Sequence, residues 1–184
     1  MKIIAVANQK GGVGKTTTSV NLSAALAAME KRVLLVDLDP QGNATVSVGL
    51  QKGDLAATAF ELLVDQQPLS QVATPLEGLG MDCVPADGDL TAAEVALLSV
   101  EDREQRLKTA LQAGKFLYDF VIIDCPPSLN MLTLNALVAA DSVLITMQCE
   151  YFALEGLSAL METINTVCQT VNPTLKIGHS AHPI

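Results

Sequence analysis

Short apolar runs alternate with longer segments of helical periodicity along the chain. Continuous apolar runs of this kind are typical of buried parallel strands. The clearest runs predict strands over residues 3–7, 32–38, 118–124 and 142–147, and weaker runs predict strands over 78–85 and 175–178. The segments between them predict helices over residues 15–29, 90–99, 101–113, 132–140 and 154–171. This alternation predicts an α/β fold, with a mostly parallel sheet and helices on both faces.

The pattern is weaker over residues 40–78, where short helices are expected at 45–50 and 58–63. Gly114 directly follows one predicted helix, as a C-terminal cap would. No repeat, linker or low-complexity stretch divides the chain. We therefore predict a single domain over residues 1–184.

The segment 154–171 has the most regular helical periodicity. Its polar side carries Glu155 and Glu162 rather than lysines, which favours packing on the core over binding to a membrane surface. The apolar residues form one stripe, which consists of Leu154, Leu157, Leu160, Met161, Ile164, Val167, Cys168 and Val171.

Composition and charge narrow the classes of function. The 184 residues are 49% hydrophobic, which is enough to bury a sizeable core. The net charge of -9 disfavours binding to DNA and to anionic lipid. The four cysteines form no Cys-x-x-Cys pair, which argues against a metal or redox motif. Neither a signal peptide nor a membrane span is visible, so we expect a cytoplasmic protein without stable membrane association.

A glycine-rich segment joins the first predicted strand to the first predicted helix. It reads Lys-Gly-Gly-Val-Gly-Lys-Thr-Thr over residues 10–17. Glycines allow backbone N–H groups to converge on a polyphosphate, and the helix N-terminus adds a partial positive charge. Lys15 could then reach the outer phosphates, and the Thr16 hydroxyl could bind Mg²⁺. The predicted nucleotide-binding residues are Gly11, Gly12, Val13, Gly14, Lys15, Thr16 and Thr17.

Carboxylates follow two other predicted strands. Asp37 and Asp39 come at the end of the second strand, and residues two apart on a strand point the same way. Both could therefore face the crevice at the carboxyl ends of the strands, where ligands of such sheets bind. Asp124 ends the hydrophobic run Val-Ile-Ile-Asp, which has the form of a Walker B element that holds Mg²⁺.

Four motifs, in order, resemble the ParA/Soj chromosome- and plasmid-partitioning ATPases. They occupy residues 10–17, 37–43, 123–128 and 148–156, and the resemblance extends to about residue 178. Gln9 stands where the ordinary P-loop pattern has a glycine, so the loop resembles the deviant Walker A variant, which is related to that of the septum-site protein MinD. The resemblance implies a P-loop ATPase fold that binds ATP or ADP with Mg²⁺.

The resemblance also implies roles for individual residues in an ATP-dependent homodimer. Lys10 would be the signature lysine that reaches the nucleotide of the other subunit, Lys15 would bind the phosphates, and Asp39 would position the attacking water. Thr16 and Asp124 would hold Mg²⁺. A ParB-type partner would stimulate hydrolysis, and full-length members would bind DNA without sequence specificity.

Members of this family run on for roughly seventy residues beyond the length of this chain, within ordinary domain size. We therefore expect a C-terminally truncated domain that lacks the adenine contacts and most DNA-binding residues. Three alternatives stay open. They are a MinD-like regulator of division at the membrane, an electron carrier similar to nitrogenase iron protein that would use Cys83 and Cys125, and a fragment with impaired ATP turnover.

Overall fold

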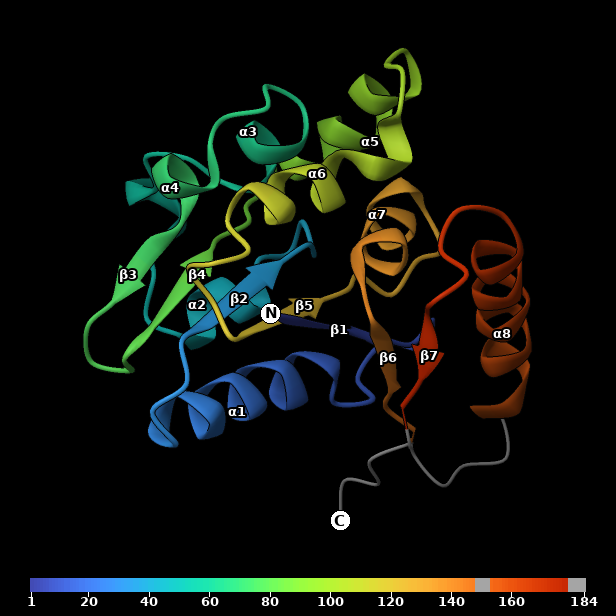
Figure 1. Cartoon of the computed structure of the whole chain (residues 1–184), viewed down its shortest axis with the longest axis horizontal. Coiled ribbons are helices and arrows are strands. Elements are labelled where there is room, and N and C mark those ends of the chain that lie inside the picture. The colour runs from blue at the N-terminus through green and yellow to red at the C-terminus, as the bar shows by residue number, and fades with distance from the viewer. Residues whose placement is uncertain (148–152, 179–184) are drawn as a thin grey trace.

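A seven-stranded sheet forms the centre of the computed structural model, which describes residues 1–147 and 153–178, without the side chains of 153–156. The strand order is β3-β4-β2-β5-β1-β6-β7 (Figure 1). Every neighbouring pair is parallel except β3 and β4. The strands are β1 (Lys2–Ala7), β2 (Val33–Asp37), β3 (Thr74–Leu76), β4 (Met81–Val84), β5 (Phe120–Asp124), β6 (Ser142–Ile145) and β7 (Lys176–Ile177). The predicted mostly parallel sheet is confirmed.

Helices cover both faces of this sheet, as predicted (Figure 1). On one face, α1 (Lys15–Ala28) and α2 (Asn43–Ser47) contribute to a small core. A larger core lies on the other face, beneath the remaining helices. These are α3 (Ala59–Leu63), α4 (Leu69–Val72), α5 (Leu90–Leu98), α6 (Arg106–Ala113), α7 (Met131–Ala139) and α8 (Ala153–Thr170).

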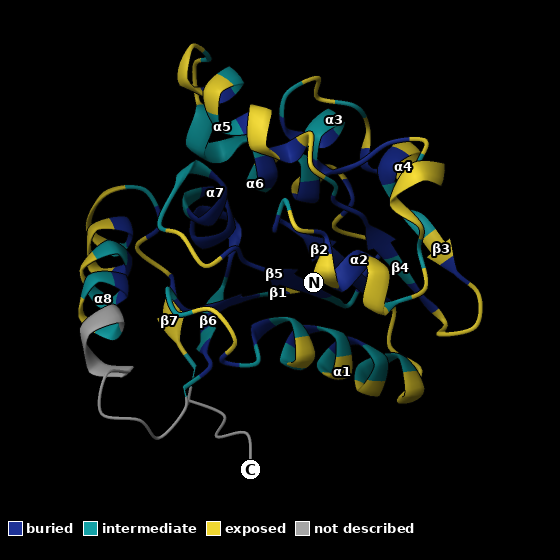
Figure 2. Cartoon of the chain, turned by 180° about the vertical axis from the view of Figure 1, so that it is seen from behind, coloured by how far each residue is buried: buried dark blue, intermediate teal, exposed yellow. Residues whose placement is uncertain are grey.

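The central strands are buried on both faces, which explains why their sequences are continuously apolar. In β5, Val121 and Ile123 point into the larger core, whereas Ile122 points into the smaller one. All three side chains are fully buried. Figure 2 shows this burial for the whole fold: the central strands are buried, whereas α1 exposes its outer side. Successive residues of a strand point to opposite faces, so a strand between two helix layers needs apolar residues throughout.

Two predicted helices differ from the observed ones. The helix predicted over 101–113 is wrong in its first part, because Asp102 has a φ of 54° and interrupts it. A 3₁₀ turn (Arg103–Gln105) follows, and α6 begins only at Arg106. The helix predicted over 45–50 lies at 43–47 as α2, which begins after Gly42 in a left-handed conformation.

Three short elements within residues 40–78 were not predicted. They are a 3₁₀ turn (Lys52–Asp54), α4 and the antiparallel strand β3. β3 has only three residues and contains Pro75, a residue that normally argues against a strand. Proline is tolerated here because β3 is an edge strand, where one N–H group needs no partner in the sheet.

Two predictions about helix ends and helix packing are confirmed. Gly114 is the C-cap of α6. Its φ of -97° is accessible to any residue, and an added Cβ would lie 2.6 Å from Cδ2 of Leu69, so the Leu69 side chain would have to move to accommodate a larger residue. In α8, Leu160, Ile164 and Val167 are buried in the larger core, whereas the side chains of Leu154 and Glu155 lie outside the described part of the structure. Within residues 1–147 and 153–178, we find no helix with the length and apolarity that a membrane crossing requires.

Candidate nucleotide-binding site

The glycine-rich loop lies between β1 and α1, as predicted. Gly12 has a φ of 73° and Gly14, the N-cap of α1, has a φ of 84°. L side chains rarely adopt such values, so these two positions favour glycine. An added Cβ at Gly11 would meet nothing within 4 Å, and its φ is not in this range. The loop therefore needs backbone freedom at Gly12 and Gly14, where the chain turns into the helix.

A cavity of about 410 Å³ opens in front of this loop. The predicted residues Gly11, Gly12, Gly14, Lys15, Thr16, Thr17 and Asp39 line it, together with Gln41, Asn43 and Pro127, which we had not singled out. Val13 is buried and does not line the cavity. Lys10 does not line it either. Three separate connections, after β1, β2 and β5, thus meet at the carboxyl ends of their strands, as open α/β sheets require.

Lys15 is the buried cation of the site, with 7% of its surface exposed. Its Nζ donates a hydrogen bond of 3.0 Å to the backbone carbonyl of Lys10. Burial lowers the pKa of Lys15, and the negative charges of Asp124 and Asp39 oppose that shift. The ammonium group is therefore desolvated, while the charges of Asp124 and Asp39 favour its protonated form. A desolvated cation of this kind gains from binding an anion.

Asp124 lies at the end of β5, opposite the first turns of α1. Its Oδ2 accepts a hydrogen bond of 2.8 Å from the Thr16 hydroxyl, and its Oδ1 accepts one of 2.9 Å from the Ser19 hydroxyl. Burial raises its pKa to about 6, although both hydrogen bonds act in the opposite direction. Ser19 was not predicted. Ser19 lies three residues after Thr16, nearly one helical turn, so the two side chains share a face of α1. This spacing was the signal in the sequence that could have identified Ser19.

These residues fit a Mg²⁺ ion that is only partly coordinated by protein. Among the described residues, no group of three or more His, Cys, Asp or Glu side chains could enclose a metal ion. Mg²⁺ usually keeps several waters and takes one or two protein ligands plus phosphate oxygens. The Thr16 hydroxyl lines the cavity, and the Asp124 carboxylate is hydrogen-bonded to it, so together they supply hard oxygen atoms of that kind. Asp124 itself is fully buried and does not line the cavity.

Asp37 and Asp39 have different environments, although Asp37 is the last residue of β2 and Asp39 follows only two residues later. Asp39 lines the cavity, and its Oδ1 accepts a hydrogen bond from the Gln41 N–H at 2.9 Å. Asp37 does not line the cavity, so the expectation that both aspartates face the crevice is wrong. Its Oδ2 instead accepts hydrogen bonds of 2.8 Å from the Thr45 N–H and hydroxyl. Asp37 therefore anchors the start of α2.

Asn8 fixes the beginning of the loop and was also not predicted. Its Nδ2 donates to the carbonyl of Thr146 at 2.5 Å, and its Oδ1 accepts from the N–H of Lys10 at 3.0 Å. The side chain thus connects the loop after β1 to the end of β6. An isolated asparagine after an apolar run is a weak signal, because asparagine is common in turns generally.

Comparison with known proteins gives the family. A family model described as an AAA domain matches residues 1–177. The sporulation initiation inhibitor protein Soj of Bacillus subtilis is 55% identical over 178 residues, which are 96% of this chain and 70% of that protein. The chromosome partitioning protein ParA of Myxococcus xanthus is 54% identical over 176 residues, 96% of this chain and 62% of that protein. The chain belongs to the ParA/Soj family of ATPases.

Solved structures support the same fold for this ParA/Soj family chain. A structure named cobyrinic acid a,c-diamide synthase from Mycobacterium smegmatis, with bound ADP and magnesium, has a TM-score of 0.95 and 44% identity. It covers 99% of this chain, which in turn covers 74% of that chain. A Cyanothece McdA variant in complex with ATP has a TM-score of 0.90 and 28% identity, with coverage of 96% and 68%. The chain spans 62% of ParA and 70% of Soj in the two relatives named above.

One motif that carried the ParA/Soj resemblance, residues 148–156, lies mostly outside the described residues.

The cysteines proposed for an electron carrier do not fit that role. Cys83 and Cys125 are free and buried, and they belong to the cores on opposite faces of the sheet. Burial raises the pKa of both thiols, which disfavours the thiolates that bind an iron–sulfur cluster.

Proposed function

We propose that this chain binds ATP with Mg²⁺ and hydrolyses it as a single ParA-type ATPase domain. The observation that carries the proposal is the buried Lys15 ammonium at a cavity lined by the glycine loop, with Thr16 and Asp124 beside it. The loop N–H groups and Lys15 would bind the phosphates. Thr16 and Asp124 would hold Mg²⁺, which when bound neutralises charge on the phosphate oxygens.

For hydrolysis, we propose that Asp39 positions the attacking water. Its carboxylate lines the cavity and is oriented through the Gln41 N–H. In-line attack on a γ-phosphate requires an oriented water and positive charge at the equatorial oxygens. Lys15 would supply one positive charge. Lys10 would supply a second in an ATP-dependent homodimer, on the nucleotide of the other subunit, which is consistent with its position outside its own cavity.

The first experiment tests the nucleotide site. Titration calorimetry with a non-hydrolysable ATP analogue and Mg²⁺ would compare the parent chain with Lys15→Ala. We expect the Kd to increase at least about tenfold, because the variant loses a charged hydrogen bond to phosphate. Lys31→Ala is the matched control, since Lys31 is exposed at the far end of α1 and should leave the Kd unchanged. Equal binding by the parent chain and Lys15→Ala would reject the assignment.

The second experiment tests dimerisation and turnover. Size-exclusion chromatography would compare the parent chain and Asp39→Ala, each with and without Mg-ATP. If Asp39 positions the water, Asp39→Ala should accumulate as a dimer with Mg-ATP, and phosphate release should fall at least about tenfold. Elution as a monomer under all conditions would refute the ATP-dependent dimer. Unchanged phosphate release by Asp39→Ala would refute the role of Asp39.

A partitioning role, stimulated by a ParB-type partner, is proposed on sequence identity with proteins named ParA and Soj. Addition of a ParB-type protein to the phosphate-release assay tests that role. Stimulation of turnover would support the role, whereas no change in turnover would contradict it.

A further inference from the structure

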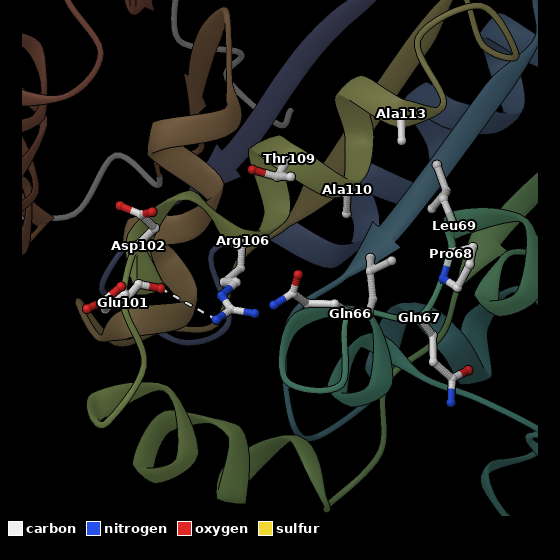
Figure 3. Close-up of a pocket in the computed structure, with 11 residues that line it drawn as sticks. Gln66, Gln67, Pro68, Leu69, Glu101, Asp102, Arg106, Thr109, Ala110 and Ala113 are labelled. Atoms are coloured by element: carbon white, nitrogen blue, oxygen red, sulfur yellow. Dashed lines mark hydrogen bonds between the residues drawn. The ribbon is translucent and has the colours of Figure 1, made fainter.

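A second cavity, of about 440 Å³, lies between the α3–α4 connection and α6 (Figure 3). None of its lining residues lines the nucleotide cavity. Its volume falls in the range of small-molecule sites in proteins. The residues around it divide into an apolar half and a polar half, so they indicate which kind of molecule would fit.

The apolar half is formed by two leucines and two alanines. Leu62 and Leu69 are buried, with 1% and 4% of their surfaces exposed. Ala110 and Ala113 of α6 line the same half and leave space that larger side chains would fill. Leu69 is also part of the larger core and lies close to the end of α6 at Gly114.

The polar half is centred on Arg106, which Figure 3 shows between Gln66 and Glu101. The guanidinium Nη2 donates to the backbone carbonyl of Glu101 at 3.4 Å. When the side-chain oxygen of Gln66 faces Arg106, it accepts a second hydrogen bond from the guanidinium. Both acceptors are neutral, and Arg106 forms no ion pair with a carboxylate of the described residues. A guanidinium with only neutral partners retains its capacity to bind an anion in a bidentate pair.

The rim is shaped by two strained residues. Gln66 has a φ of 55° and Asp102 a φ of 54°, values that L residues other than glycine rarely adopt. Gln66 lies in the α3–α4 connection, and Figure 3 shows its side chain directed toward Arg106. Glu101 and Asp102 also line the cavity, but both residues are exposed, and Figure 3 shows their carboxylates directed away from the guanidinium of Arg106. The half-buried guanidinium is therefore the charge that a bound molecule would meet inside the cavity.

We propose that this cavity binds an aliphatic carboxylate. The carboxylate would pair with Arg106, and the aliphatic part would pack on Leu62, Leu69 and Ala110. Two molecules share this chemistry, namely a free short-chain acid and a peptide C-terminus with an aliphatic last residue. The peptide would also offer amide groups to Gln66 and Gln67. The proposal is independent of nucleotide binding, because the two cavities share no residue.

The experiment uses three probes and detects binding through chemical-shift changes in the labelled chain. N-acetyl-leucine carries the carboxylate, the aliphatic group and one amide. N-acetyl-leucinamide replaces the carboxylate with a neutral amide, and 4-methylpentanoate lacks only the acetamido group. We expect N-acetyl-leucine to bind with a Kd of about 1 mM, as ligand efficiency permits for a molecule of this size. N-acetyl-leucinamide should bind at least about tenfold more weakly. An equal affinity for 4-methylpentanoate indicates a free acid, and a weaker affinity for 4-methylpentanoate indicates a peptide terminus.

Two variants on α6 separate the pocket from general charge effects. Arg106→Gln should weaken N-acetyl-leucine binding at least about tenfold. Lys108→Gln is the matched control, because it removes the same charge from the same helix at a residue that does not line the cavity. Ala113→Leu keeps Arg106 but fills the apolar half, so it should also abolish binding, and it provides the test if Arg106→Gln does not fold. Equal binding of acid and amide, an equal loss in Lys108→Gln, or no binding to the parent chain would overturn the proposal.

Discussion

At the scale of single residues, the site shows how burial changes the acidity of its carboxylates. Asp37 and Asp124 are both fully buried, and burial raises their pKa values to about 7 and about 6. They differ in what surrounds them, because Asp37 is enclosed by backbone and Thr45, whereas Asp124 is bonded to Thr16 at the nucleotide cavity. The raised pKa of Asp124 matters for a metal, which binds the ionised carboxylate and competes with the proton.

The apparent affinity for Mg²⁺ should therefore depend on pH. Since the pKa of Asp124 is raised to about 6, most of its carboxyl is protonated at pH 5 and ionised at pH 7. The affinity should rise by about tenfold over this interval and then level off. Titration of Mg²⁺ in the presence of an ATP analogue would measure this change. Asp124→Asn serves as the control, because only the titration of the nucleotide should remain. An identical pH dependence in the parent chain and Asp124→Asn would contradict the expectation.

At the scale of elements, long apolar or periodic segments were predictable and short contact-dependent ones were not. β1, β2 and β5 could be predicted because strands buried on both faces are continuously apolar. The start of α2 could not, because it is set by the Asp37–Thr45 hydrogen bonds between residues whose partners are not visible in the sequence. The site followed the same rule. The glycine loop has its own local signature, whereas Asn8 and Ser19 each depend on one partner more than a hundred residues away.

Gly42 lies between β2 and α2, directly before the first residue of α2, so its replacement should destabilise the fold. Its φ is 56°, and an added Cβ would lie 2.5 Å from the backbone oxygen of Ala86. Gly42→Ala should therefore destabilise the fold by about 2 to 4 kcal/mol, from strain and from the backbone clash together. Urea unfolding would measure the free energy of unfolding. Gly49→Ala is the matched control, with a φ of 92° but nothing within 4 Å, and it should lose only the strain part, about 1 kcal/mol. Equal losses in the two variants would refute the proposed contact.

At the scale of the whole molecule, the chain combines a complete phosphate-binding edge with a strongly acidic charge. The loops after β1, β2 and β5 are all present at that edge. The net charge is -9, with 11 basic residues against 20 acidic ones. Nucleotide binding depends on a few buried groups and is insensitive to this total. Contact with DNA depends on basic residues gathered on one surface, and that requirement is sensitive to the balance of charge.

We accordingly expect this chain to show no measurable affinity for duplex DNA, with or without Mg-ATP. Fluorescence anisotropy of a labelled duplex at low and at physiological salt would measure binding. Low salt favours any electrostatic contact, so a lack of binding there is the stronger result. Binding that weakens steeply with salt would show that basic residues of this chain form a DNA surface despite its net charge.

The bond between the Lys15 ammonium and the Lys10 carbonyl has a consequence for ligand affinity. A triphosphate that engages this ammonium takes it from an oxygen of the same loop. The measured affinity is then the difference between an incoming contact and the one it displaces, so a change that weakens the internal contact would tighten ATP binding without touching the nucleotide. Since the carbonyl belongs to Lys10, any movement of that residue toward a second subunit would change the affinity of Lys15 for the phosphates in its own subunit.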